Sequence, residues 1–357
     1  MATTQTAEVE RPGEEQTTMR AVQVNHAGGP LELVERPIPE PGPGQVRIKV
    51  EACGICHSDA YTKEGTLPVK YPRIPGHEVA GRIDKVGEWA RLFKVGDRVG
   101  VGWHGGHCFE CDQCRRGNFI ECFRAQATGV SFDGGYAEYL VVPWDAVAWL
   151  PAQLSSVEAA PLLCSGITTF NALRNSGARP GDLVAIQGIG GLGHLAIQFA
   201  NKMGCRVVAI STSKDKEELA HKLGAHHFIA TETGNVTVEL LKMGGANVAL
   251  ATAPSGAAMT PLVNGLAPNG KLMIVAGSPD PVAVQPGLLI GKRRVLQGWA
   301  SGTASDWEDT LNFSVLTGVR AMVEVYPLEQ ATQAYERMIT NQARFKAVLE
   351  ITPGIGQ

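Results

Sequence analysis

The sequence lacks several features that would place it in a specialised class of proteins. It has no excess of charge of either sign, because 32 Lys and Arg residues face 35 Asp and Glu residues and the formal net charge is -3. A chain without a basic field has no electrostatic basis for holding nucleic acid or an anionic membrane. No apolar run approaches the ~20 residues of a membrane span, and the N-terminus lacks the pattern of a secretion signal. There is no internal repeat and no low-complexity tract. We therefore expect a cytoplasmic, globular protein without nucleic-acid or membrane partners.

Length and cysteine content bound the remaining possibilities. With 357 residues, of which 44% are hydrophobic, the chain is too large for one ordinary core and fits two domains. Residues 1–18, rich in Thr, Glu and Gln, are expected to form a flexible N-terminal tail. In a reducing compartment, the eight cysteines favour metal ligation over a disulfide framework.

Four of the cysteines lie in one short stretch. They are Cys108, Cys111, Cys114 and Cys122. Gaps of two, two and seven residues are typical of a tetrahedral, structural zinc site. An iron–sulfur cluster is the competing interpretation, but the bacterial ferredoxin run closes with a three-residue gap and a proline, whereas Phe123 follows the last cysteine here. Four protein ligands leave no open position on the ion, so we expect this zinc to stabilise a lobe while catalysis occurs elsewhere.

The segment after the tail has the pattern of short strands joined by turns. From Gln45 to Ala52, apolar and polar residues alternate after the turn sequence at 41–44, which predicts a half-buried strand. Further strand-like runs cover Gly96–Val101 and Ala137–Val142. This pattern is typical of an irregular β-barrel with long functional loops.

The pattern changes near Ser155, where a helical stretch begins. Apolar runs then alternate with helix-like segments, which predicts a parallel, doubly wound sheet. The expected strands are Leu183–Gln187, Val207–Ile210, His227–Ala230, Val248–Ala251 and Leu272–Ala276. The last segment, from about Val295, ends in a helical pattern at Leu328–Met338 and a strand at Ala347–Ile351.

A glycine-rich loop follows the first of these strands. Its residues are Gly188, Gly190, Gly191, Leu192 and Gly193. The loop lies between the strand Leu183–Gln187 and a predicted helix at His194–Met203, which is the context that a dinucleotide-binding motif requires. The glycines permit a tight turn, and a pyrophosphate can then lie at the N-terminus of the helix.

The end of the next strand bears on the choice of dinucleotide. An acidic residue there, about 20 positions after the loop, binds the adenosine ribose and repels a 2′-phosphate. In this chain Ser211 takes that place. The hydroxyl residues Thr212 and Ser213 follow, and Lys214 adds positive charge, which favours NADP(H). In the alternative interpretation, Lys214 and Lys216 belong only to a solvated helix start, and Asp215 reaches the ribose of NAD(H).

Three further potential metal ligands lie outside the four-cysteine cluster. Cys56, His77 and Cys164 would form a set that leaves the fourth zinc position free for water or substrate. Each alone has a simpler explanation. Cys56 could form a redox pair with Cys53, and His77 could be an ordinary loop histidine. Cys164 could be a small apolar residue on a helix. The spacing by itself does not unite them.

Five segments together resemble the medium-chain, zinc-dependent alcohol dehydrogenase family, in which they occur in the same order. They are Gly54–Asp59, Pro75–Glu78 with Gly81, Cys108–Cys122, Cys164–Thr169 and Gly188–Gly193. The resemblance runs from about Met19 to the C-terminus. It implies a GroES-like, irregular β-barrel catalytic domain formed by residues 19–155 and 296–357. It also implies a doubly wound Rossmann dinucleotide-binding domain at residues 156–295.

The resemblance assigns roles to the candidate metal ligands. Cys56, His77 and Cys164 would bind a catalytic zinc, and the four clustered cysteines a structural zinc, which makes two zinc ions per chain. Glu78 and Asp59 would lie around the catalytic ion, and Asp59 would orient a ligating histidine.

The resemblance also assigns residues to the cofactor and the substrate. Ser58 would carry the alcohol proton through the cofactor ribose, and His57 would lie near the pyrophosphate. Residues expected to face the nicotinamide are Thr168, Val275, Ala276 and Gly277. Trp103 is expected to line the substrate pocket, although it could equally be a core residue. Lys346, with Arg344 close by, aligns best with an arginine that commonly contacts the pyrophosphate. Tyr61 takes the place of a histidine that ends the proton relay in many members.

The implied activity is the interconversion of alcohols with aldehydes or ketones, with NADP(H) preferred, NAD(H) possible and aldehyde reduction favoured. The resemblance further implies a homotetramer. One alternative is an NAD-linked alcohol or polyol dehydrogenase. Another is a non-enzymatic zinc- and nucleotide-binding protein, which the loss of a catalytic ligand would indicate, although all three ligands are retained.

Overall fold

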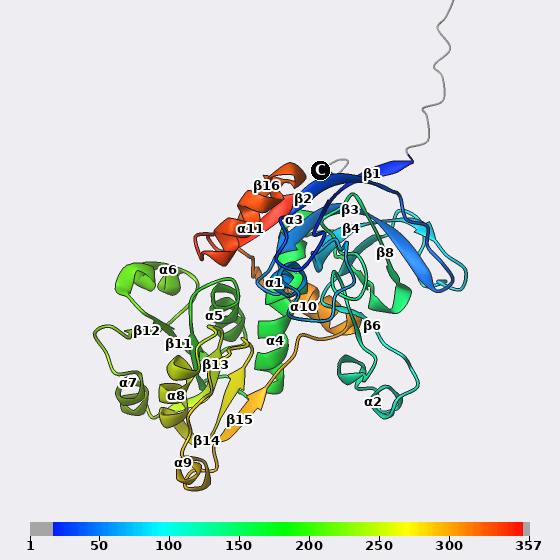
Figure 1. Ribbon diagram of the computed structural model, residues 1–357. Coiled ribbons are helices and arrows are strands. Elements are labelled where there is room, and N and C mark those ends of the chain that lie inside the picture. The colour runs from blue at the N-terminus through cyan, green and yellow to red at the C-terminus, as the bar shows by residue number, and fades with distance from the viewer. Residues whose placement is uncertain (1–16, 353–357) are drawn as a thin grey trace, which may run out of the picture.

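The computed structural model describes residues 17–352, and the tail expected at residues 1–18 lies outside this part except for its end, where Thr18 begins the first strand. Two sheets organise the molecule (Figure 1). A six-stranded sheet lies among α5–α9, and a seven-stranded sheet forms the β-rich part, with helix α4 between them.

The six-stranded sheet is parallel throughout, in the order β12-β11-β10-β13-β14-β15. Its strands are β10 (Leu183–Gln187), β11 (Arg206–Ser211), β12 (His227–Ala230), β13 (Ala246–Ala251), β14 (Leu266–Ile274) and β15 (Val295–Gly298). Its helices are α5 (Gly193–Lys202), α6 (Glu217–Lys222), α7 (Val236–Lys242), α8 (Gly256–Asn264) and α9 (Pro286–Ile290). The order reverses at β10, which is the arrangement of a dinucleotide-binding fold, and ligands bind where the order reverses. The predicted doubly wound sheet is confirmed.

Several element boundaries differ from the sequence-based expectation by one or two residues, and two differences matter for the six-stranded sheet. The strand expected at Leu272–Ala276 begins earlier, at Leu266, and ends at Ile274, so Val275 and Ala276 lie beyond its end. The sheet also includes β15, so it extends past the boundary expected at residue 295. A four-residue edge strand carries little periodicity, and only its pairing with Lys271–Ile274 identifies it.

The seven-stranded sheet has the order β16-β17-β3-β4-β5-β9, with β8 paired to β3. Its strands are β3 (Gln45–Ile55), β4 (Glu78–Val86), β5 (Arg98–Val101), β8 (Tyr139–Pro143), β9 (Ala148–Trp149), β16 (Val323–Pro327) and β17 (Lys346–Glu350). Strand β17 comes from the far end of the chain and pairs antiparallel with the end of β3, where Ala347 faces Ile55. The C-terminal segment therefore completes the β-rich domain.

The remaining elements are short. The strands are β1 (Thr18–Gln23) and β2 (Glu32–Pro37), which pair, and β6 (His104–Gly106) and β7 (Gln126–Ala127), which also pair. The helices are α1 (Asp59–Glu64), α2 (Asp112–Arg115), α3 (Ser156–Ala159), α4 (Ser165–Asn175), α10 (Ala304–Thr317) and α11 (Ala331–Ile339). Short 3₁₀ turns occur at Phe119–Glu121, Trp144–Ala146, Ala160–Leu163, Lys214–Lys216 and Leu328–Gln330. The helical stretch expected near Ser155 is present, and Ser155 caps it with Glu158 in a capping box.

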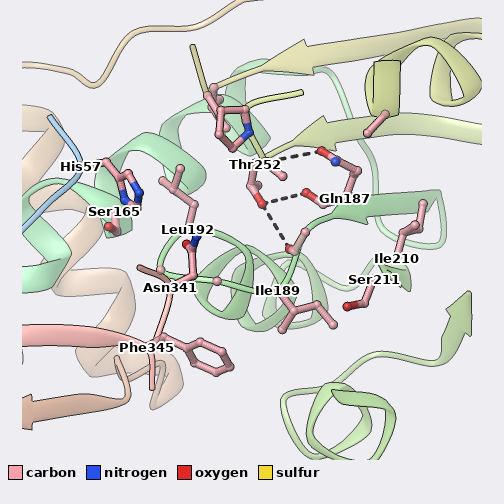
Figure 2. Close-up of a pocket in the computed structure, with 18 of the residues that line it drawn as sticks. His57, Ser165, Gln187, Ile189, Leu192, Ile210, Ser211, Thr252, Asn341 and Phe345 are labelled. Atoms are coloured by element: carbon pink, nitrogen blue, oxygen red, sulfur yellow. Dashed lines mark hydrogen bonds between the residues drawn. The ribbon is translucent and has the colours of Figure 1, made fainter. Parts of the chain in front are cut away.

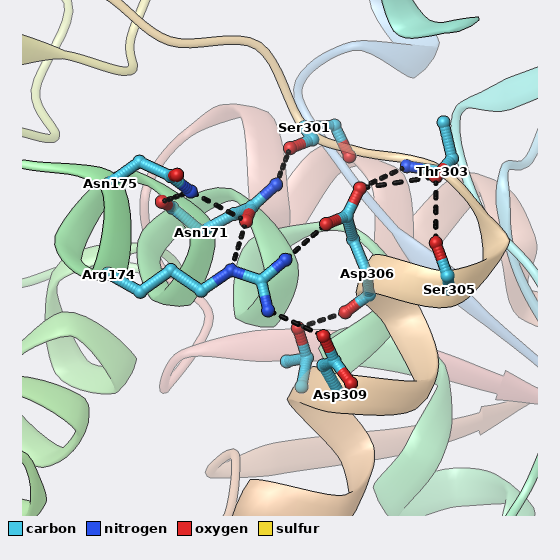
Figure 3. A network of polar contacts seen from close by, with 9 residues as sticks. Asn171, Arg174, Asn175, Ser301, Thr303, Ser305, Asp306 and Asp309 are labelled. Atoms are coloured by element: carbon cyan, nitrogen blue, oxygen red, sulfur yellow. Dashed lines mark hydrogen bonds and ion pairs between the residues drawn. The ribbon is translucent and has the colours of Figure 1, made fainter. Parts of the chain in front are cut away.

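Helix α4 joins the two parts of the molecule. Its residues Ile167, Ala172 and Leu173 are buried in a core shared with the six-stranded sheet. On its polar side, Arg174 forms ion pairs with Asp306 and Asp309 of α10 (Figure 3). These contacts fix the helix that begins directly after Cys164.

Candidate active site

The four clustered cysteines form one compact group on a lobe that carries α2 (Figure 1). Their four sulfurs lie within 4.8 Å of one another. Sulfur–sulfur distances of 3.5 Å (Cys108–Cys122) and 3.9 Å (Cys108–Cys114 and Cys111–Cys122) are close to the ~3.8 Å separation of ligands around a tetrahedral zinc. The N–H groups of Cys111 and Arg124 donate to these sulfurs at 3.4 and 3.3 Å. The donor set and its geometry fit a structural zinc.

The second group unites the three distant ligands. Cys56, His77, Glu78 and Cys164 each offer a donor atom within 4.8 Å of the others. Cys56 Sγ lies 3.7 Å from Cys164 Sγ, and His77 Nε2 lies 3.4 Å from the same sulfur. Two sulfurs and an imidazole at these distances fit a catalytic zinc, and all eight cysteines of the chain are free thiols.

A buried carboxylate orients the histidine of this group. Asp59 Oδ1 lies 2.8 Å from His77 Nδ1, which leaves Nε2 directed at Cys164. Asp59 Oδ2 accepts hydrogen bonds from the Cys56 N–H at 2.9 Å and from the Tyr136 hydroxyl at 2.8 Å. Such partners fix the tautomer and orientation of a ligating histidine. The position expected for Asp59 agrees with this geometry, whereas Tyr136 had no sequence signal.

Glu78 is fully buried beside these ligands and is paired with Lys346. Lys346 Nζ lies 2.6 Å from Glu78 Oε1 and donates to the Ile55 carbonyl at 3.0 Å. Glu78 Oε2 has no hydrogen-bond partner within the described part of the chain, which suits a carboxylate that faces a cation. A Cβ at Gly54 would lie 1.9 Å from this oxygen, so only glycine leaves room for it.

The pKa values of the cluster follow from these contacts. The hydrogen bond between the two sulfurs lowers the pKa of Cys56 well below its ordinary value and raises that of Cys164, so of the two it favours the thiolate at Cys56. Burial acts to lower the pKa of His77, but the Asp59 carboxylate raises it. Burial also acts to lower the pKa of Lys346, yet the Glu78 carboxylate raises it above the ordinary value. Lys346 is therefore cationic.

One cavity of about 1160 Å³ joins this group to the glycine-rich loop. Cys56, Ser58 and Cys164 are among its lining residues, as are Gly188–Leu192 and Ser211. Figure 2 shows His57 and Ser165 on one side, with Ser211 and Ile210 on the other. The metal donors and the dinucleotide loop thus open onto the same space.

The glycine loop has the expected geometry. Gly188 follows β10 with a φ of +92°, in the left-handed region that favours glycine. A Cβ at Gly193 would lie 1.8 Å from the Gly188 carbonyl oxygen, so the first turn of α5 can approach the strand only with glycine there. Thr252 Oγ1 donates to the carbonyls of Gln187 and Gly188 at 2.8 and 3.1 Å (Figure 2). The sequence analysis did not identify Thr252, because it comes from the neighbouring strand end.

The structure separates the residues proposed for the 2′-phosphate. Ser211 and Thr212 line the cavity, whereas Ser213 and Lys214 do not, and Lys214 borders a second hollow beside His221. Lys216 lines the cavity and donates to the Ile189 carbonyl at 2.8 Å. Asp215 does not line the cavity and accepts a hydrogen bond from Ser213 at 3.0 Å.

The cavity is lined by cationic but not by anionic side chains. Lys216, Arg344 and Lys346 line it, and none of its described lining residues is an Asp or Glu. Lys346 is paired with Glu78, so the cationic side chains of the described lining without such a carboxylate partner are Lys216 and Arg344. The basic residues expected from the sequence were Lys214 and Lys346.

The residues expected near the nicotinamide line the same cavity as Cys56 and Cys164. Thr168, Val275, Ala276 and Gly277 line the cavity. The Tyr61 hydroxyl lies beside Gly277. Trp103 is half-buried and packs edge-on against His77 and Tyr61, with ring centroids 5.1 and 6.0 Å away, so it borders the metal donors although it does not line the cavity.

No helix within residues 17–352 is both long and apolar enough to cross a membrane.

Comparisons with known proteins agree with this geometry. The alcohol dehydrogenase GroES-like domain family matches residues 42–152, and the zinc-binding dehydrogenase family matches residues 191–315. The chain is 42% identical over 335 residues to the alcohol dehydrogenase patD of Penicillium expansum, which covers 93% of this chain and 98% of the relative.

Solved structures are similar over nearly the whole chain. A cinnamyl alcohol dehydrogenase from Sorghum bicolor has a TM-score of 0.85 and 30% identity, covering 95% of this chain and 100% of its own. The protein CAD from Helicobacter pylori, complexed with NADP(H), has a TM-score of 0.84 and 25% identity, covering 95% of this chain and 99% of its own. An NAD-dependent alcohol dehydrogenase has a TM-score of 0.86 and 28% identity, covering 94% and 100%. These neighbours therefore include proteins that use either dinucleotide.

Proposed function

Because the chain belongs to the medium-chain, zinc-type alcohol dehydrogenase family, we propose that it interconverts alcohols with aldehydes or ketones by hydride transfer with NADP(H), and that it acts well as an aldehyde reductase. The observation that carries this proposal is the shared cavity, which brings the donors Cys56 and Cys164 together with the glycine loop. A zinc held by Cys56, His77 and Cys164 would polarise the substrate oxygen, and a nicotinamide would give or take the hydride.

The side chains of this protein position the reactants and move one proton. Ser58 lines the cavity two residues after Cys56, where its hydroxyl can exchange a proton with the substrate oxygen. Asp59 keeps His77 in the tautomer whose Nε2 is free for the metal. Thr168 and Ala276 bound the space in which the nicotinamide ring would lie. Tyr61 also lines this space, with its hydroxyl beside Gly277.

Preference for NADP(H) is supported by the charge of the cavity. Ser211 ends β11 without a carboxylate to repel a 2′-phosphate, and Lys216 with Arg344 supplies positive charge. We assign the lysine contact to Lys216 in place of Lys214, because only Lys216 lines the cavity.

The test is the ratio of kcat/KM with NADPH to that with NADH, measured over a panel of alcohols and aldehydes on protein of known zinc content. We expect a ratio of at least about ten, and Ser211→Asp should bring it below one by adding the missing carboxylate. Lys216→Met should lower it about tenfold, since one charge-assisted contact is removed. Lys214→Met is the matched control and should leave it unchanged. A wild-type ratio below one would instead indicate an NAD-linked alcohol or polyol dehydrogenase.

A further inference from the structure

His194 is a fully buried histidine directly after the glycine loop, in the first turn of α5. Its imidazole contacts no metal donor. The ring stacks on Phe345, with centroids 4.9 Å apart and an interplanar angle of 29°. A polar ring in such a buried place must satisfy both of its nitrogens.

The two nitrogens have opposite hydrogen-bonding roles. His194 Nδ1 lies 2.9 Å from the Gly190 carbonyl oxygen, which can only accept. His194 Nε2 lies 3.2 Å from the Met322 backbone nitrogen, which can only donate. The ring is therefore neutral, with its proton on Nδ1. Burial lowers the pKa of His194 to about 4, and the Lys346 ammonium opposes the charged form as well, so this state persists at neutral pH.

The bond to Gly190 fixes a peptide unit of the glycine loop. The Gly190 carbonyl also accepts from the His194 backbone N–H at 3.1 Å, so two donors hold it. In a planar, trans peptide the C=O and the next N–H point in opposite directions. Holding the Gly190 carbonyl toward α5 therefore turns the Gly191 N–H away from the helix, on the side where both glycines line the cavity.

The hydrogen bond from Met322 connects His194 to the β-rich domain. Met322 directly precedes β16, and its carbonyl accepts from the N–H groups of Phe345 and Lys346 at 2.9 and 3.0 Å. One turn further along α5, Gln198 donates to the Arg320 carbonyl at 2.9 Å. The glycine loop is thus joined through His194 to the strand that carries Lys346, which in turn reaches Glu78.

We propose that His194 is a positioning residue for the dinucleotide: as a neutral bridge between Gly190 and Met322, it holds the glycine loop against the catalytic domain and thereby sets the affinity for the cofactor pyrophosphate. This inference rests on the proposed function, because it presupposes that a dinucleotide binds in the cavity. It assigns His194 no part in the transfer of hydride or proton.

The experiment compares substitutions that remove one or both bonds, in the full-length, zinc-loaded protein. His194→Phe keeps a ring for Phe345 but removes both bonds, and we expect the Kd of NADPH to rise at least tenfold while kcat at saturating cofactor stays within threefold. His194→Asn can retain the donor to Gly190, and His194→Gln can place an acceptor toward Met322. Each of these two should recover part of the lost affinity. His226→Gln is the matched control, since His226 also bonds a backbone group, but that group is the Val207 N–H of β11 and not part of the glycine loop.

The outcomes separate this inference from the proposed function. If His194→Phe is folded and binds NADPH with the wild-type Kd, or if it loses kcat while the Kd is unchanged, the positioning role is wrong. Should His194→Phe fail to fold, the Asn and Gln variants decide in the same way, because wild-type Kd values for both would contradict the proposal. If the wild-type protein turns over alcohols with NADPH, the proposed function stands whatever the variants show. If it binds neither NADPH nor NADH, the proposed function fails and this inference fails with it.

Discussion

The two cysteine-rich groups differ in how far apart their donors lie along the chain. The lobe group takes all four sulfurs from between residues 108 and 122, and two of its cysteines are half-buried. The cavity group takes its donors from residues 56, 77–78 and 164, and His77 and Glu78 are almost completely buried. A local group needs only a short loop closure, whereas a dispersed group needs the folded domain to bring its members together. Substitutions in the lobe group should therefore lower the stability of the protein, whereas substitutions in the cavity group should lower its activity.

The largest effect is expected from removing a donor at the cavity. Cys164→Ser should lower kcat/KM by at least about 1000-fold, because the polarisation of the substrate oxygen depends on the ion held there. Zinc content should fall from two ions to about one per chain, with the melting temperature little changed. Metal analysis, kinetics and thermal unfolding of the same sample test this. Cys205→Ser, at a buried cysteine outside both groups, should behave as wild type.

Breaking the lobe group should give the opposite result. Cys111→Ser removes one of four ligands from a site that holds a lobe with little core of its own. We expect a loss of about 4 kcal/mol in stability, or a melting temperature lower by roughly 10 °C. Activity at 25 °C should fall less than tenfold. Full activity loss with an unchanged melting temperature would show that the two groups do not divide their roles in this way.

Acid should remove the stability that the buried, neutral His194 contributes. His194 has a folded-state pKa of about 4, against an ordinary value of 6.5, so the unfolded chain binds more protons between these values. Its stabilising contribution is complete above about pH 6.5 and is lost as the pH falls toward 4, by about 3 kcal/mol at most. Denaturant unfolding of wild type and His194→Phe across this range should show the two stabilities converging as the pH falls. A constant difference would contradict the prediction.

The smallest effects should come from the residues behind His77. Asp59→Asn should weaken zinc retention at the cavity about 10- to 100-fold, since the carboxylate that orients His77 is lost. Tyr136→Phe removes only one hydrogen bond to Asp59, and a two- to tenfold effect is expected. Competition with a chelator measures both. The lobe zinc serves as an internal control, and its retention should not change in either variant.

Features formed by residues that are neighbours along the chain could be predicted from the sequence. The strand at Leu183–Gln187 and the glycines after it could be identified because a turn, a strand and a helix start follow one another directly. The assignment of Lys214 to the cofactor stays a prediction, and the sequence could not show that Lys216, two residues further along the same 3₁₀ turn, lines the cavity while Lys214 does not. Lys346 was expected to contact a pyrophosphate, but its amine bonds Glu78 and Ile55. Its partners are more than 260 residues away in the chain, where no spacing rule applies.

By itself, the sequence determined the four-cysteine group, the glycine loop and the presence of Ser211 where an acidic residue would bind the ribose of NAD(H). Each of these features depends on residues that are neighbours along the chain. Only the tertiary structure decided that Cys56, His77 and Cys164 meet beside the cavity that the glycine loop lines, and that Tyr136 bonds Asp59 while His194 bonds Gly190. The physical reason is that these contacts form across sheets and between domains, where burial and hydrogen-bond partners are fixed by the packing of whole elements.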